Sequence, residues 1–299
     1  MDTFAPLLIV GFGDIARRAA PPLLASYRVT ALVRDQDARA RGDMPAIRVL
    51  QGDLDDPASL VPLAGFAERV VHLAPPPDHG RVDTRTRNLI EALSGGAMVA
   101  QGLHLPSRFV YISTTGVYGD CGGALIDETR PVNPHTDRAR RRVDAEERLL
   151  VWGREHGVAV TILRVPGIYA SDRLPIERVR KGTPVLVDPE DVYTNHIHAD
   201  DLARIVCAAL ERGGAGEIYN ATDDTDLKMG EWFDLIADRA GLQRPPRIAR
   251  SMASNLISPA LLSFMSESRR ISNGKMKRDL GIVLQYPTVH AGLPDRIEW

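Results

Sequence analysis

The feature that most constrains this chain is a regular alternation between short apolar runs and segments of helical length. Runs rich in β-branched residues occupy positions 6–10, 28–34, 47–53, 69–75, 108–114, 158–166 and 216–222. Most of the segments between them are long enough for a crossover helix. Near-continuous apolar strands joined by helices are typical of a parallel sheet that is covered on both faces. The sequence therefore predicts an α/β fold with a doubly wound parallel sheet.

The pattern changes after residue 222. Positions 199–212 still predict an amphipathic helix, but the remainder reads as helices interrupted by proline and by a serine-rich stretch. A chain of 299 residues is also long for one compact core. We therefore expect a larger domain over residues 1–170, rejoined by 196–222, and a smaller, mostly C-terminal lobe over 171–195 and 223–299.

Composition excludes several classes of partner. Lys and Arg number 37 against 39 Asp and Glu, a net charge of -2, so no global field attracts nucleic acid or a membrane surface. Cys121 and Cys207 lie far apart without a metal or redox spacing, which suits a reducing compartment. The N-terminus lacks a basic leader, and no apolar window approaches membrane-spanning length. We expect a soluble, cytoplasmic protein with no nucleic-acid or membrane partner.

The stretch GFGDIA follows the first predicted strand and opens the first helix, which is the context of a dinucleotide-binding turn. Gly11 allows the tight turn, and Gly13 lets the backbone approach a pyrophosphate. That pyrophosphate would sit on the N–H groups of the first helical turn, at Asp14 and Ile15. Ala16 permits close packing of helix against strand. A glycine turn without a ligand is the alternative, but the position after a first strand favours the cofactor site.

The second predicted strand ends in a charged pair that bears on which cofactor is bound. Arg34 would pair with the 2′-phosphate of NADP, whereas Asp35 would accept a hydrogen bond from the ribose 2′-hydroxyl of NAD. Arg34 comes first, so NADP is slightly favoured over NAD. An ordinary solvated charge pair is the alternative for each residue.

The stretch VYISTTGVYGD, residues 110–120, resembles the extended branch of the short-chain dehydrogenase/reductase superfamily, which includes nucleotide-sugar epimerases and dehydratases. Segments that resemble the same family lie at 51–56, 70–76, 162–170, 195–204 and 272–293. The resemblance covers nearly the whole chain. It implies a Rossmann-type fold that binds NAD(P) in the larger domain and a small-molecule substrate between that domain and a smaller substrate lobe.

The resemblance also implies cofactor contacts beyond the glycine turn. They are Asp53 and Leu54 near the adenine, Leu73, Ala74 and Pro75 in the loop after the fourth strand, and Val165 and Pro166 at the end of the sixth strand.

The family mechanism uses a Ser or Thr, a Tyr, and a Lys four residues after the Tyr. The phenol carries the substrate proton, the Lys lowers its pKa and holds the nicotinamide ribose, and the Ser or Thr orients the substrate oxygen. This tuning is needed because an ordinary tyrosine pKa near 10 matches neutral pH poorly. The hydroxyl position falls on Thr114.

The Tyr and Lys should come from NPHTDRARRRVDAEERLL, residues 133–150, which holds four arginines in five residues. Anchoring on Glu146 places Arg142 at the Lys position and Arg138 at the Tyr position. Arg142 would hold the ribose, but a guanidinium group cannot relay a proton at pH 7. A second register, with Thr136 and Arg140, supplies no phenol either. The usual Tyr-x-x-x-Lys pattern is missing in both.

Three interpretations of this arginine run stay open. Pairs at i,i+4, Arg142 with Glu146 or Arg140 with Asp144, would make it a solvated, salt-bridged face. One or two arginines would otherwise bind an anionic substrate or a cofactor phosphate, because guanidinium suits bidentate recognition. A nucleic-acid patch is disfavoured, since no aromatic residues interleave.

If the protein is an enzyme, another group must carry the proton. The candidates are Tyr118, His135, which has a suitable ordinary pKa, and Tyr169. The alternative for each is a structural or exposed position with no part in catalysis. His196 and His198 stand at alternating positions, but no third ligand accompanies them, so we expect no metal site.

Two functions remain. The first is an NAD(P)-dependent epimerase, dehydratase or reductase that acts on a nucleotide-sugar or other hydroxy/keto compound. Thr114 would orient the substrate oxygen, Arg142 or Arg140 would hold the ribose or an anionic group, and Tyr118 or His135 would move the proton. The second is a non-catalytic NAD(P)-binding redox sensor or regulatory protein. Family precedent makes a homodimer possible, although no apolar stripe in the sequence can be assigned to an interface.

Overall fold

The computed structural model describes residues 4–34, 45–95 and 104–298. Its centre is a seven-stranded sheet of order β12-β7-β5-β4-β1-β2-β3, with every neighbouring pair parallel. The strands are β1 (Ala5–Val10), β2 (Tyr27–Val33), β3 (Arg48–Gln51), β4 (Arg69–His72), β5 (Arg108–Thr114), β7 (Ala159–Val165) and β12 (Glu217–Asn220). The predicted Rossmann-type parallel sheet is confirmed, and the strand order reverses direction between β1 and β4.

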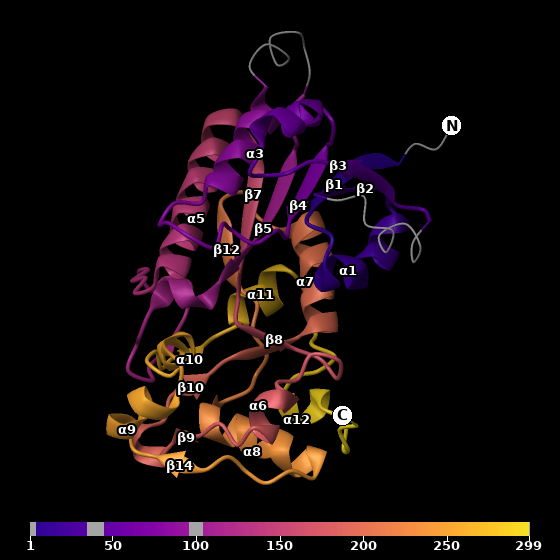
Figure 1. The fold of residues 1–299 in the computed structure, drawn as a ribbon. Helices are drawn as coiled ribbons and strands as arrows, with labels where there is room; N and C mark the ends of the chain where they lie inside the picture. Colours follow the sequence, from indigo (N-terminus) through magenta and orange to yellow (C-terminus); the bar gives the residue numbers. More distant parts are fainter. Residues whose placement is uncertain (1–3, 35–44, 96–103, 299) are drawn as a thin grey trace.

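Helices cover both faces of this sheet (Figure 1). The helices α1 (Asp14–Leu24), α7 (Ala199–Arg212) and α11 (Gly274–Asp279) share one buried apolar cluster with it. On the other face, α3 (Thr84–Ser94), α5 (Asp137–His156) and the 3-10 helix η1 (Pro57–Leu63) share a second cluster. The amphipathic helix predicted over 199–212 is confirmed as α7.

A smaller group of elements lies beyond the carboxyl ends of the strands (Figure 1). Its apolar cluster, built around Tyr169, Trp232 and Phe233, is separate from the two that flank the sheet. Four two-stranded ladders pair β6 with β15, β8 with β11, β9 with β14 and β10 with β13. The strands are β6 (Leu125–Ile126), β8 (Gly167–Tyr169), β9 (Val185–Leu186), β10 (Tyr193–Thr194), β11 (His196–His198), β13 (Leu227–Lys228), β14 (Arg247–Ile248) and β15 (Arg270–Ile271).

The remaining helices are short, apart from α8. They are η2 (Thr115–Tyr118), α6 (Ile176–Arg180), η3 (Asp188–Glu190), α8 (Met229–Ala240), α9 (Arg250–Leu256), α10 (Pro259–Phe264) and α12 (Val289–Gly292). No helix within the described ranges is both long enough and apolar enough to cross a membrane.

Helix α5 connects the sheet to the smaller lobe. The Thr136 side chain caps its start by accepting a hydrogen bond from the backbone N–H of Ala139. Further along, Ala145, Leu149 and Trp152 are buried in the cluster on the sheet. The C-terminal half is therefore anchored in the core, while the arginine-rich first turns lie at the carboxyl edge of the sheet, where ligands bind in open α/β folds.

Candidate active site

Two cavities follow the carboxyl edge of the sheet and meet at Pro75. The smaller cavity, of about 230 Å³, is formed by the ends of β1, β2 and β3 and by the loop after β4. The larger cavity, which we call the cleft, has a volume of about 630 Å³ and lies between the sheet and the smaller lobe. A ligand that spans both would pass across the strand-order reversal, which is where dinucleotides bind in this type of sheet.

The glycine turn between β1 and α1 has the shape that a dinucleotide needs. Gly11 has φ +85°, and a Cβ there would lie 2.8 Å from the backbone nitrogen of Ala74. A Cβ on Gly13 would meet nothing within 4 Å, so the space in front of it is open. No side chain caps the start of α1. Its first N–H groups are therefore available for a pyrophosphate, and these residues fit NAD(P).

Several predicted cofactor residues come together in the smaller cavity. They are Gly11, Arg34, Asp53, Leu54, Ala74 and Pro75. Asp35, the residue that would favour NAD, lies outside the described residues. Arg85 also lines this cavity and was not predicted; it pairs with Asp55 at 2.6 Å and donates to the backbone oxygen of Pro75.

The other predicted cofactor residues are placed differently. Ala16 and Val165 are buried in the core, and Ile15 and Leu73 pack against it. The Asp14 carboxylate forms ion pairs with Arg18 and Arg173. Pro166 lines the cleft and not the smaller cavity. These side chains shape the turn and the sheet edge, and of this group only Pro166 lines a cavity.

Thr114 and Arg142 line the cleft together, at the end of β5 and in the second turn of α5. The Thr114 hydroxyl accepts a hydrogen bond of 3.2 Å from the backbone N–H of Gly116. The Nη1 group of Arg142 donates to the Tyr111 hydroxyl at 2.9 Å and to the backbone oxygen of Ile112 at 2.7 Å. These bonds hold the start of α5 against the end of β5.

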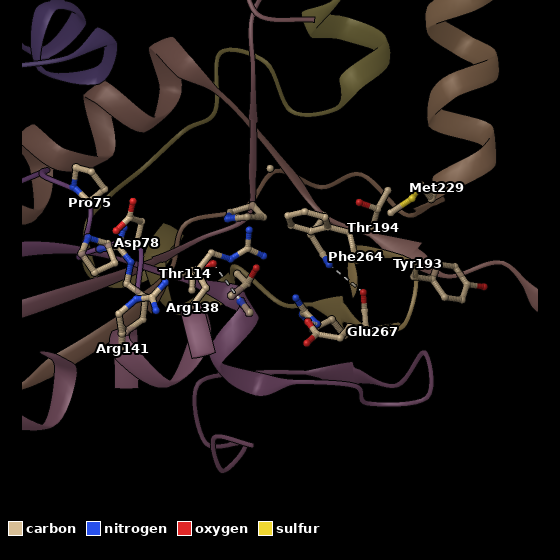
Figure 2. Close-up of a pocket in the computed structure, with 18 of the residues that line it drawn as sticks. Pro75, Asp78, Thr114, Arg138, Arg141, Tyr193, Thr194, Met229, Phe264 and Glu267 are labelled. Atoms are coloured by element: carbon tan, nitrogen blue, oxygen red, sulfur yellow. Dashed lines mark hydrogen bonds and ion pairs between the residues drawn. The ribbon is translucent and has the colours of Figure 1, made fainter. Parts of the chain in front are cut away.

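The two walls of the cleft come from different parts of the chain. Figure 2 shows Asp78, Thr114, Arg138 and Arg141 on one side, and Tyr193, Thr194, Met229, Phe264 and Glu267 on the other. The hydroxyl of Tyr193 points away from Thr114 in this view. The first wall belongs to the sheet edge and α5, and the second belongs to the smaller lobe.

Two ion pairs considered for α5 from the sequence do not form, and other pairs take their place. Glu146 faces the sheet and pairs with Arg164 of β7 at 2.7 Å, and Asp144 pairs with Arg148 at 3.0 Å. Arg140 pairs with Asp137, one turn earlier, at 2.7 Å. The two pairs considered for a salt-bridged face, Arg142 with Glu146 and Arg140 with Asp144, therefore do not form, although Arg140 and Asp144 each pair with another residue of α5. Spacing along a helix identifies neighbours on that helix, but not the neighbours that other elements supply.

The structure places Tyr118 in the interior, away from the cleft. Its side chain is 1% exposed, and its hydroxyl donates to Oδ1 of Asn220 at 2.8 Å. The Arg164 guanidinium lies 4.7 Å from its ring centre. Burial raises the pKa of the phenol. This placement corrects the expectation that Tyr118 meets the substrate, because η2 turns the ring inward beneath α5.

His135 and Tyr169 are also absent from the residues described along the cleft. His135 is exposed just before α5. Tyr169 is buried in the smaller lobe, where its hydroxyl donates to the backbone oxygen of Thr288 at 3.2 Å. This is a second correction: the proton carriers considered from the sequence do not reach the cavity.

His196 and His198 belong to an aromatic cluster. The His196 ring lies 4.5 Å from Trp232, and the His198 ring lies 3.8 Å from Tyr286. Burial lowers the pKa of His196 to about 3, so this imidazole is neutral at pH 7. Within the described residues, no three His, Cys, Asp or Glu side chains are grouped as metal ligands.

Sequence reasoning missed most of the far wall of the cleft. The residues concerned are Tyr193, Thr194, Met229, Phe264, Glu267 and Arg269. They come from three separate segments of the smaller lobe, and no local motif links them. The sequence gives no signal for such a wall until the chain is folded.

Comparison with known proteins identifies the family to which this chain belongs. Residues 7–222 match the model of the NAD dependent epimerase/dehydratase family. A dTDP-glucose 4,6-dehydratase from Streptomyces niveus is 26% identical over 210 residues, which are 67% of this chain and 62% of that protein. The match thus spans less than two thirds of that relative's length.

Two further proteins are similar along almost the whole chain. Protein YeeZ of Escherichia coli K12 is 27% identical over 290 residues, covering 93% of this chain and 95% of YeeZ. A solved structure described as that of a functionally unknown conserved protein from Silicibacter pomeroyi DSS has a TM-score of 0.77 at 27% identity, and the match covers 96% of both chains. Because the family model matches well over half of its residues, the chain belongs to the NAD dependent epimerase/dehydratase family.

Proposed function

We propose that this chain is an NAD(P)-dependent oxidoreductase of epimerase, dehydratase or reductase type. Its substrate would be a nucleotide-sugar or another compound with a hydroxyl or keto group, bound in the cleft. The observation that supports this proposal is that Thr114 and Arg142 share one cavity, which meets the smaller cavity beside the glycine turn at Pro75.

Thr114 would orient the substrate oxygen. Its oxygen already accepts a hydrogen bond from Gly116, so the hydroxyl proton is available to donate to a substrate carbonyl or alkoxide. A donor aimed at the oxygen on which charge develops lowers the barrier to hydride transfer. When bound, NAD(P) supplies the hydride donor or acceptor.

Arg142 would hold the nicotinamide ribose. Its Nη1 group is fixed by Tyr111 and Ile112, whereas Nε and Nη2 bond to no residue in the described ranges. Those two nitrogens are free to donate to ribose hydroxyl groups. The Lys that the family uses would do the same and would also lower the pKa of a catalytic phenol, but no phenol stands at the expected position of α5 here.

Solvent water would then supply or accept the proton. No histidine lines the part of the cleft that the structure describes, and Arg138 stands where the register anchored on Glu146 would place the phenol. In the reducing direction, the substrate carbonyl carbon gains the hydride, the electron pair moves to oxygen, and water supplies the proton. The positive side chains of α5 would stabilise the alkoxide before that proton arrives.

We also propose that NADP binds more tightly than NAD. Arg34 borders the smaller cavity, where a 2′-phosphate would be placed, and guanidinium is well suited to phosphate.

The experiment is an absorbance assay at 340 nm. Purified protein, with NADP or NAD and then with each reduced cofactor, is mixed with a panel of nucleotide-sugars and simple hydroxy or keto acids. A change that depends on the substrate supports the oxidoreductase. A flat trace across the panel, with cofactor binding shown by calorimetry and no substrate converted to its epimer, would favour the alternative given next.

The alternative is a non-catalytic NAD(P)-binding sensor or regulatory protein. The specific observation in its favour is the arginine at the expected phenol position, together with a histidine-free lining in the described cleft. A sensor of redox state should distinguish oxidised from reduced cofactor by a large difference in affinity while catalysing no turnover.

A further inference from the structure

The cleft carries more positive charge than its own carboxylates neutralise. Glu267 pairs with Arg269 at 2.8 Å. Asp78 is almost fully exposed and bonds to the neighbouring His79. The α5 arginines of the cleft wall, Arg138, Arg141 and Arg142, form no ion pair with any carboxylate in the described part of the chain.

These three arginines occupy one face of α5, because their spacing is i, i+3 and i+4. Arg142 donates to the backbone oxygen of Ile112, two residues before Thr114. This bond fixes the arginine face beside the end of β5. Figure 2 likewise shows Arg138 and Arg141 on the same wall as Thr114.

Arg141 has an incompletely satisfied guanidinium group. The residue is 6% exposed, and its Nη1 donates to the backbone oxygen of Gly80. Its Nε is buried and has no hydrogen-bond partner among the described residues. A buried, charged donor without an acceptor is costly, so a ligand that supplies an acceptor would be favoured at this position.

Arg138 is held in place by a cation–π contact. Its guanidinium carbon lies 4.3 Å from the ring centre of Phe264 in the opposite wall. Burial lowers the pKa of Arg138, and the nearby Arg142, Arg141 and Arg269 lower it further, while Glu267 opposes this effect. An arginine still remains charged at pH 7. The result is a cluster of like charges whose mutual repulsion an anion would relieve.

We propose that the cleft selects a substrate in which an oxyanion, a carboxylate or a phosphate, lies beside the reacting hydroxyl or keto group. Arg138 and Arg141 hold this oxyanion while Thr114 orients the reacting oxygen. Among the described residues, the opposite wall offers one positive side chain, the paired Arg269, so the substrate charge belongs on the α5 side. The placement of the reacting group rests on the proposed function, but the oxyanion site itself does not.

The test is a thermal-unfolding titration of the full chain saturated with NADP, at constant ionic strength. The probes are inorganic phosphate and malonate, with malonamide as the neutral counterpart. Both anions are expected to raise the unfolding temperature saturably, because a ligand that binds only the folded state stabilises it. A shift with phosphate alone identifies a phosphate substrate, and a shift with malonate alone identifies a carboxylate substrate; either supports the site.

The variants Arg138→Gln and Arg141→Gln should require at least about tenfold more anion for the same shift, the loss of one charge-assisted contact. Arg138→Lys should recover part of the affinity for the anion. Arg140→Gln is the matched control on the same helix, because Arg140 pairs with Asp137 and does not line the cleft. The inference is overturned if all variants respond equally, or if malonamide shifts the unfolding temperature as much as malonate.

A second readout separates this inference from the proposed function. Once a substrate is found at 340 nm, the acid is compared with its amide. If kcat/KM is at least tenfold higher for the acid than for the amide, the oxyanion site is supported. Equal values would support the oxidoreductase but contradict the oxyanion site. Saturable anion binding without hydride transfer would support the oxyanion site and contradict the proposed oxidoreductase activity.

Discussion

Thr114 is the residue on which the proposed chemistry depends most. Its hydroxyl stands at the end of β5 in the cleft, beside the Gly116 N–H. Thr114→Val keeps the shape but removes the donor, so kcat/KM should fall about 100-fold or more, the usual cost of losing one oxyanion donor. The cofactor Kd, measured by calorimetry, should not change. Thr114→Ser retains the hydroxyl and is the control; full activity in the valine variant would remove Thr114 from the mechanism.

Asp223 gives a prediction for stability against pH. It is 3% exposed, Oδ2 has no hydrogen-bond partner in the described structure, and burial raises its pKa to about 7. An unfolded aspartate releases its proton near pH 3.9. The folded state therefore binds more protons between about pH 4 and pH 7, and this group's contribution to stability falls as pH rises through that window.

Asp223→Asn should abolish that fall. Relative to wild type, the variant should gain stability between pH 5 and pH 8, because an amide stays neutral while Asp223 must ionise. Urea unfolding at the two pH values measures the difference. An identical gap at pH 5 and pH 8 would show that Asp223 does not titrate in this range.

At the scale of elements, the buried pair between α5 and β7 should matter most. Glu146 and Arg164 are each about 4% exposed at the side chain, and Ser113 also donates to Glu146. Glu146→Gln leaves a buried guanidinium without its counter-charge, so the free energy of unfolding should drop by about 3–5 kcal/mol. The exposed Glu147→Gln provides the control, with a change within about 0.5 kcal/mol. A loss as small as this at Glu146 would contradict the account.

The elements also show how far sequence reasoning reaches. The seven sheet strands were predictable, because each is an apolar run bounded by turns or helices. The loop after β4 was partly misjudged: the run 69–75 ends as a strand at His72, because the backbone N–H groups of Leu73 and Ala74 both bond to the carbonyl of Val10 and the ladder stops there. The ladders of the smaller lobe have two or three residues per strand, which is too short for a periodicity signal.

The residues of the site were predictable from the sequence where each belongs to a local motif at the end of one strand. Gly11, Asp53 and Thr114 come from local motifs, and each lines a cavity. The partners of the α5 arginines were not predictable, because Phe264 and Glu267 approach from segments more than 100 residues away. Only tertiary packing decides which charged groups meet in the cleft.

At the scale of the whole molecule, the described lining of the cleft includes no histidine, and this predicts an unusual pH profile. With solvent as the proton source, kcat/KM should stay level between about pH 6 and pH 9, since no histidine in the described lining of the cleft would act as a general acid or base. Initial rates in buffers of constant ionic strength measure this. A limb with an apparent pKa near 7 would point to an acid–base residue and contradict proton exchange with water.

We propose that hydride transfer takes place across the two joined cavities without a tyrosine in the usual position. Single-turnover absorbance at 340 nm tests it most directly, because reduced cofactor is detected even in an epimerase with no net redox change. We predict a transient or lasting absorbance change when substrate is mixed with excess wild-type protein carrying NADP or NAD, and its loss in Thr114→Val. A substrate converted to product with no absorbance change in either protein would contradict the claim.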